Sequence, residues 1–157
     1  MITRENINVA VGTRIDSALT AAGLPTERRK SDDPAPIDRR SLQIVLEELT
    51  VDPMGEYRRC DQAVRVFFYP QNDEQYRDEI WGAVNALESS LISPLIINGA
   101  ELYLSDDGIT ADMTGEVLEI TFSLSWIEVR SIDSDLDIME TLEYKMEEID
   151  YVISSRN

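Results

Sequence analysis

Residues 117–129 read Val-Leu-Glu-Ile-Thr-Phe-Ser-Leu-Ser-Trp-Ile-Glu-Val, and apolar side chains alternate with polar ones throughout the segment from Leu118 to Trp126. A period of two is typical of a β-strand that packs one face on a core and turns the other toward polar surroundings. We therefore expect an antiparallel sheet with one covered face. On that face the strand should carry Leu118, Ile120, Phe122, Leu124 and Trp126.

Two earlier segments predict a hairpin in the same sheet. The first is a strand over residues 41–51, with Leu42, Ile44 and Leu46 on one face. A turn at residues 52–55 contains Pro53 and Gly55, residues favoured in turns. The second strand covers residues 57–69. It should place Cys60, Val64, Val66 and Phe68 toward the core, and Arg59, Asp61 and Arg65 on the opposite face.

Two segments have helical periodicity. Residues 4–22 repeat apolar side chains every three or four positions, with Thr3 as N-cap and Gly23 just beyond the end. A second helix is predicted over about residues 72–92, with Asn72 and Gln75 arranged like a capping box and Pro94 after its end. Residues 26–40 predict a polar loop, and short extended segments at 100–104 and 109–113 flank a predicted turn at 105–108.

The order of helix, two strands, helix and three strands predicts an α+β fold: a mainly antiparallel β-sheet with two helices packed on one face. The length of 157 residues suits one domain, which we place at residues 1–130. Residues 131–157 form a predicted acidic C-terminal arm, with eight acidic residues against Lys145 and Arg156. Neither a signal peptide nor an apolar run of membrane-spanning length is evident, so we expect no membrane partner.

The chain contains no histidine and one cysteine, which excludes Ser-His-Asp triads, Cys-His pairs and cysteine-rich zinc sites. Asp133, Asp135 and Asp137 are spaced like the start of a calcium loop, but Ile138 and Tyr144 stand where that loop needs Gly and Glu. The remaining candidates have simpler explanations: Glu143 and Lys145 as a chance nuclease-like triplet, Asp106-Asp107 as turn residues and Cys60 as a buried apolar residue. We predict no enzyme, cofactor or metal.

The net charge of −17 is unevenly distributed along the sequence. Residues 1–65 carry ten basic and eleven acidic side chains, whereas residues 66–157 carry four and twenty. The basic residues are mostly arginines, often adjacent. We interpret Arg58, Arg59 and Arg65 as candidates for contacts with acidic groups of a neighbouring subunit, with ordinary solvated charges as the alternative.

The order of these features resembles the tail terminator, or tail completion, proteins of long-tailed bacteriophages, of the type found in phages and prophages of Gram-positive hosts. The resemblance covers about residues 40–145 and the leading helix. Its elements are the following: Tyr57-Arg58-Arg59, the strand ending Val66-Phe67-Phe68-Tyr69-Pro70, the helix from Asn72 to Leu91, a hairpin from Asp107-Gly108 through 118–122, and residues 139–143.

The resemblance implies a structural protein that forms a ring, expected to be hexameric, at the head-proximal end of the virion tail. Such a ring caps the tail tube, ends tail polymerisation and provides the head-joining surface, after assembly in the host cytoplasm. Its implied partners are further copies of the chain, the tail tube protein, the head-tail connector protein and, in a contractile tail, the sheath protein. DNA is implied only as passing cargo, because an acidic lumen would not hold phosphates.

Two other functions stay open. A head-tail joining, or connector, protein of the same particle would share these properties. An acidic DNA-mimic inhibitor would need carboxylates spaced like phosphates along one exposed face. Strand 117–129 is expected to offer only Glu119 and Glu128 on its polar face, which argues against the mimic.

Overall fold

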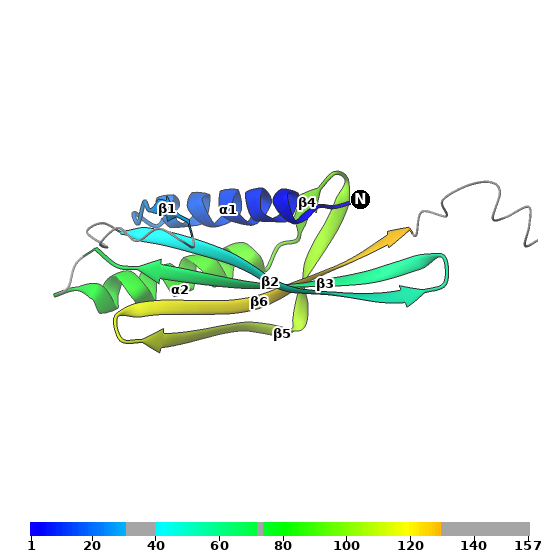
Figure 1. The fold of residues 1–157 in the computed structure, drawn as a ribbon. Helices are drawn as coiled ribbons and strands as arrows, with labels where there is room; N and C mark the ends of the chain where they lie inside the picture. The colour runs from blue at the N-terminus through cyan, green and yellow to red at the C-terminus, as the bar shows by residue number, and fades with distance from the viewer. Residues whose placement is uncertain (31–39, 72–73, 130–157) are drawn as a thin grey trace, which may run out of the picture.

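In a computed structural model the chain is described over residues 1–30, 40–71 and 74–129. The described elements are the helices α1 (Arg4–Ala21) and α2 (Tyr76–Leu91) and the strands β1 (Glu27–Arg29), β2 (Ser41–Met54), β3 (Tyr57–Tyr69), β4 (Leu95–Ile97), β5 (Ala100–Thr114) and β6 (Val117–Val129). The strands form one sheet in the order β1-β2-β3-β6-β5-β4 (Figure 1). All neighbours are antiparallel except β1 and β2, so the predicted α+β fold is confirmed.

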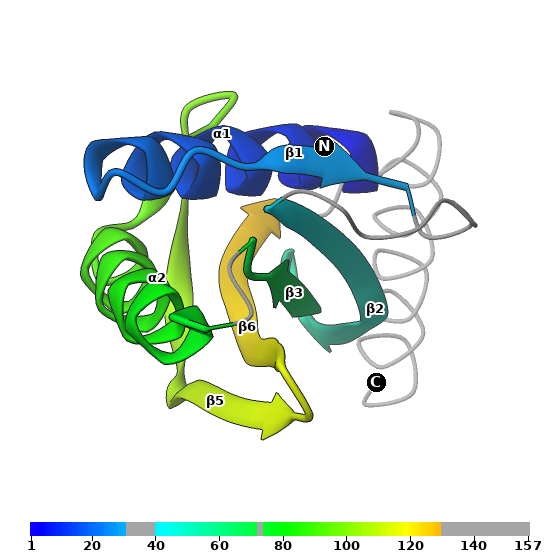
Figure 2. The same ribbon diagram turned by 90° about the vertical axis from the view of Figure 1, so that its left-hand side faces the viewer.

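Both helices cover the same face of a curled sheet (Figure 2). The core lies between them and the alternating apolar side chains of β3 and β6, and the five residues predicted to be buried in β6 are all buried. Helix α1 contributes Ile7, Val11, Ile15 and Leu19, spaced four residues apart on one stripe. Helix α2 contributes Ile80, Ala83, Leu87 and Leu91.

Local capping explains where α1 begins. The Thr3 hydroxyl accepts a hydrogen bond from the Asn6 N–H at 3.1 Å, and the Asn6 side chain accepts one from the Thr3 N–H at 3.2 Å. This reciprocal pair satisfies two backbone donors that a helix start leaves without partners. The Arg14 guanidinium joins the two helices, because it donates to the carbonyl group of Ser90 in the last turn of α2 and to those of Ser93 and Pro94 just beyond its end.

Several expectations about loops and boundaries are wrong. Residues 27–29 are the short strand β1 within the predicted loop, and β2 extends to Met54, so the hairpin turn is Gly55-Glu56. Residues 105–108 are not a turn between two strands. They are an irregularity within the single strand β5, where the register with β6 shifts between Leu104 and Ile109, and the hairpin turn comes later at Gly115-Glu116.

Two further differences concern α2 and the strand after it. Helix α2 begins at Tyr76 with Gln75 as N-cap and no side-chain cap, whereas Asn72 lies outside the described residues. Strand β4 was not predicted. It pairs with β5 across Asn98-Gly99, both of which have positive φ (52° and 81°), the conformation that two-residue hairpin turns require and that Asn-Gly favours.

A β-bulge in β2 is built around the buried side chain of Gln62. Glu47 and Glu48 lie opposite the single residue Ala63, so the strand bends there. The Gln62 amide group donates to the carbonyl oxygens of Glu47 (3.3 Å), Glu48 (3.2 Å) and Ala63 (2.8 Å). The Arg4 guanidinium at the start of α1 also donates to the carbonyls of Leu46 and Glu47. These donors replace ladder hydrogen bonds that the bulge removes.

Replacing Gln62 with Leu should therefore lower the free energy of unfolding by about 1–3 kcal/mol, because the bulge carbonyls lose a donor inside the protein. Urea denaturation followed by circular dichroism measures the change. The matched control is Ser123→Ala, a polar residue on the opposite face of β6, which should stay within about 0.5 kcal/mol of the parent. Equal stability of both variants would show that the bulge does not depend on Gln62.

Candidate functional site

The ends of β2, β3 and β6 project beyond the helices (Figure 1). The reason is length: the 13 residues of β3 span about 43 Å at 3.3 Å per residue, whereas the 18 residues of α1 span about 27 Å at 1.5 Å per residue. We call the projecting part, residues 49–60 and 127–129, the arm. Because no helix covers it, its large apolar residues remain in contact with solvent.

The arm carries an unusual share of the exposed large apolar side chains in the described part of the chain. Strand register places Met54, Tyr57 and Val129 side by side on the uncovered face of the sheet, with Ile127 next to them beside Arg59. Val129 is 71% exposed and Ile127 is 61% exposed. Leu49 and Val51 are exposed on the other face, so the arm presents apolar surface on both sides.

Glu128 lies within the arm, opposite Arg58, and ties three segments together. Its carboxylate accepts hydrogen bonds from the Ile2 backbone N–H (2.8 Å), the Trp126 indole N–H (3.0 Å) and the Arg58 guanidinium (2.6 and 3.0 Å). Burial alone would raise the pKa of the Glu128 carboxyl, but these donors together hold that pKa below its ordinary value. The N-terminus, β3 and β6 are thereby fixed relative to one another.

The three arginines singled out from the sequence do not share one surface. Arg58 is on the helix-covered side of the sheet, directly opposite Glu128, whereas Arg59 and Arg65 are on the uncovered side. Arg59 pairs with Asp61 at 3.2 Å, and Arg65 bridges Glu47 (3.0 Å) and Glu119 (3.2 Å). The expectation that Glu128 lies on the polar face of its strand is wrong, because its even position puts it on the side of Trp126.

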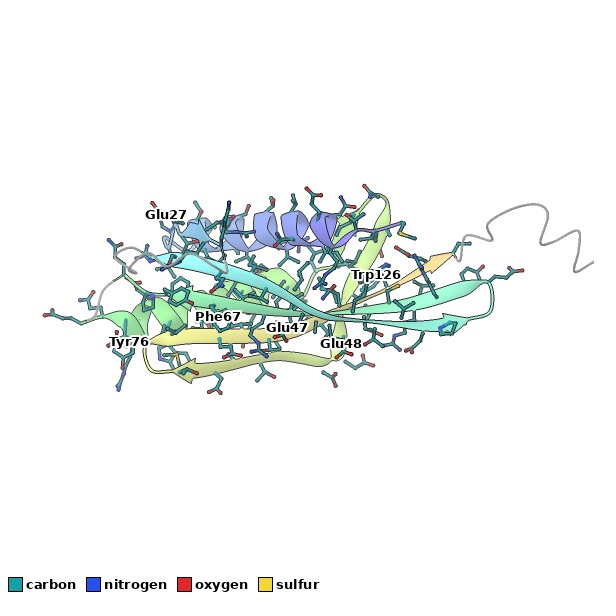
Figure 3. The ribbon with its side chains drawn as sticks, viewed as in Figure 1. Glu27, Glu47, Glu48, Phe67, Tyr76 and Trp126 are labelled. Carbon is teal, nitrogen blue, oxygen red and sulfur yellow. The ribbon has the colours of Figure 1, made fainter. Side chains whose placement is uncertain are left out.

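A second apolar surface lies at the other end of the molecule, where α2 begins; Figure 3 shows Tyr76 there and Trp126 toward the arm. We call it the α2 groove. It is a hollow of about 480 Å³ between α2 and the β5–β6 hairpin. Its lining is mainly apolar: Tyr76, Ile80, Trp81, Val84, Ala111, Met113 and Leu118, with Arg77 at the edge.

Trp81 is the most exposed large apolar side chain of the groove, at 67%. Its helical neighbour Ile80 belongs to the buried stripe, and Trp81 is about 100° away from it around the helix. The sequence does show a large apolar residue outside the buried stripe of this helix. Helical periodicity alone, however, does not identify such a residue as part of a binding surface. Met113 was likewise missed, because β5 was predicted as two short pieces.

Helix α2 is held in place by an ion pair at its first turn. The Arg40 guanidinium donates to both carboxylate oxygens of Glu79, at 2.9 and 3.1 Å, and the Gln71 N–H donates to the same carboxylate at 2.9 Å. The Arg40 contact is the main cause that holds the pKa of Glu79 below its ordinary value. The groove is thus anchored to the beginning of β2 and to the segment after β3.

The described residues give little support to catalytic chemistry. Within residues 1–30, 40–71 and 74–129, no group of three potential metal-ligating side chains is positioned to hold an ion. The Cys60 thiol is buried, as predicted, and burial raises its pKa, so it favours the neutral form over the reactive thiolate. Asp133, Asp135, Asp137, Glu143 and Lys145 lie outside the described residues. Neither described helix has the length and apolar character to cross a membrane.

Stability should depend on pH through Glu128. Because its pKa is lower in the folded state than in the unfolded state, Glu128 contributes stability above the ordinary carboxyl pKa of about 4.3, and that contribution is lost as pH falls through the folded value. Glu128→Gln should lower the free energy of unfolding at pH 7 by about 1.5–3 kcal/mol and flatten its decrease between about pH 5 and pH 3.

Chemical denaturation at a series of pH values measures both effects. The control is Glu116→Gln, in the exposed β5–β6 turn, which should match the parent within about 0.5 kcal/mol at pH 7. An unchanged pH slope in Glu128→Gln would assign the acid sensitivity to other carboxylates.

Comparison with known proteins identifies the family. The model of the phage tail terminator protein family matches residues 6–135, which is most of the chain. Among solved structures, a chain of the structure titled "Virion of native gene transfer agent (GTA) particle" aligns with a TM-score of 0.46 and 16% identity, over 76% of this chain and 91% of that one. No curated protein matches the sequence. The resemblance seen in the sequence is therefore confirmed: the chain belongs to the phage tail terminator protein family.

Proposed function

We propose that this protein is a non-enzymatic structural subunit that forms a ring, most simply a hexamer, at the head-proximal end of a phage tail. The ring caps the last ring of the tail tube, ends tube polymerisation and provides the surface to which the head connector binds. The observation that carries the proposal is the family match over residues 6–135. The uncovered apolar surface of the arm supports it, because surfaces of this kind mark sites of protein association.

The proposed partners are further copies of the chain, the tail tube protein, the head-tail connector protein and, in a contractile tail, the sheath protein. Assembly would take place in the host cytoplasm, before the subunit enters the virion. DNA would pass through the lumen of the ring as cargo. The net charge of −17 is compatible with passage, because a surface rich in carboxylates gives phosphates no binding partner.

The native mass of the purified protein, measured over a range of concentrations with negative-stain images of the same samples, tests ring formation. We expect rings near six times the subunit mass of 17.8 kDa, on the order of 100 kDa, either alone or on purified tail tubes. Deleting the gene tests the role in the particle. Overlong tails are expected, whereas normal tails that fail to join heads would assign the chain to the connector instead.

The proposal includes contacts between subunits made by the three arginines. Their positions in the structure make them unequal candidates for this role. Arg58 holds Glu128 within the subunit, so reversing its charge would disturb folding as well as assembly. Arg65 is engaged by two carboxylates. Arg59 is the most exposed of the three, with about half of its side chain accessible, and is the best candidate for a contact between subunits.

Arg59→Glu should weaken ring assembly or binding to tail tubes roughly tenfold while leaving thermal unfolding nearly unchanged. The control is Lys30→Glu, which makes the same charge change at an exposed residue after β1. Sedimentation at several concentrations gives the comparison. If the two variants assemble alike, Arg59 is an ordinary solvated residue of its strand.

A further inference from the structure

We propose that the arm of one copy docks into the α2 groove of the next copy, so that one contact type, repeated head to tail, closes the ring. This inference rests on the proposed function and names the surfaces that would make it work. Both surfaces are defined above by their residues, and each leaves apolar side chains exposed at one end of the molecule.

Both surfaces are apolar, and their shapes are complementary. The arm is a protruding edge that carries Met54, Tyr57 and Val129, and the groove is a hollow whose walls include Trp81 and Met113. A protrusion that enters a hollow buries more of these side chains than two flat faces would. Aromatic side chains such as Tyr57 and Trp81 are common at the centres of protein interfaces.

The charges at the edges are complementary. Arg77 lines the groove. Its guanidinium donates to the neighbouring Tyr76 hydroxyl at 3.4 Å and lies 6.0 Å from the centre of the Tyr76 ring, but no carboxylate among the described residues pairs with it. At the tip of the arm, Glu56 is exposed and forms no ion pair among the described residues. Asp52 is exposed opposite Arg59, which forms its ion pair with Asp61 instead. Docking brings the free cation of one copy to the free carboxylates of the next.

The same charges disfavour the symmetric alternative. In an arm-to-arm dimer the groove would stay uncovered, and Arg77 would remain without a carboxylate partner among the described residues. An arm-to-groove contact joins unlike surfaces, and a heterologous contact of this kind builds closed rings when its rotation allows.

Pairing of strand edges between copies is also disfavoured, although much of β2 and β5 lies at the edge of the sheet. The β2 edge is interrupted by the bulge at Glu47-Glu48, where Arg4 and Gln62 already occupy carbonyl groups, and by Pro53, which has no N–H. The β5 edge is interrupted by its own irregularity and carries Asp106, Asp107 and Asp112. Bulges, prolines and charges are the features that prevent edges from pairing.

Cysteine cross-linking of the full chain tests the contact. Glu56→Cys places a thiol on the arm and Arg77→Cys places one on the groove, while the buried native Cys60 stays in place and the parent chain serves as its control. A short bis-maleimide should join the two single variants only when they are mixed. The double variant should give a ladder of products up to the size of the ring. Thr20→Cys, exposed on α1, replaces either partner as the matched control.

Each outcome decides between alternatives. Dimers formed by Glu56→Cys alone would show an arm-to-arm contact and overturn the proposal. Rings that form without any arm-to-groove product would also overturn it, while leaving the proposed function intact. Absence of rings and of products, both in solution and on purified tail tubes, would contradict the proposed function as well.

Trp81 provides an independent readout. The other tryptophan, Trp126, is buried, so a blue shift of fluorescence on assembly would report burial of Trp81. Trp81→Glu should raise the concentration needed for assembly about tenfold or more, whereas Val9→Glu, at a similarly exposed apolar residue of α1, should not. Unchanged assembly of Trp81→Glu, or an emission already blue-shifted in the monomer, would overturn docking into this groove.

Discussion

The strands of this protein are longer than the helices that cover them, and much of its surface chemistry follows from that mismatch. Where α1 and α2 lie on the sheet, the even positions of β3 and β6 hold Val64, Val66 and Phe122. Toward the arm the same positions become Cys60 with Trp126 and then Arg58 with Glu128. Apolar packing thus changes to an ion pair as the helical cover ends, since a charged pair needs solvent or hydrogen bonds around it. This ion pair lies within the arm, and of the described residues of β3 and β6 only Tyr57 and Val129 pair beyond it before the hairpin turn.

Periodicity predicts what depends on neighbouring residues in the sequence. The alternation from Leu118 to Trp126 identifies β6 and its buried face, and Thr3 identifies the start of α1, because both features come from local geometry. If the same alternation is extended to Glu128, it correctly predicts the face of the sheet on which Glu128 lies. The role of Glu128 depends on Ile2 and Arg58, which are distant in sequence. The continuity of β5 could not be predicted from Asp106-Asp107-Gly108, because a turn and an irregularity within a strand use the same residue types. Strand β4 could have been found from Asn98-Gly99.

The candidate surfaces were harder to predict than the fold. Arg58, Arg59 and Arg65 look alike in the sequence, yet odd and even positions separate them onto two faces, and all three have carboxylate partners within the subunit. The exposed apolar residues of the arm and of the α2 groove are ordinary strand and helix residues in composition. They become distinctive only when the length of the helical cover is known. Trp81 shows the same point, since its exposure depends on which face of α2 meets α1 and the sheet.

The interrupted edges of the sheet also affect how a single copy of the chain behaves when it meets other strands. A chain with long, regular edge strands would risk joining any similar edge it met, and such mispairing is a route to aggregates. Here the bulge at Glu47-Glu48, with Pro53 beyond it, removes that risk along β2, and the acidic residues of β5 remove it on the other side. Combined with a net charge of −17, which makes free copies repel one another, this arrangement disfavours unspecific joining of sheet edges between copies.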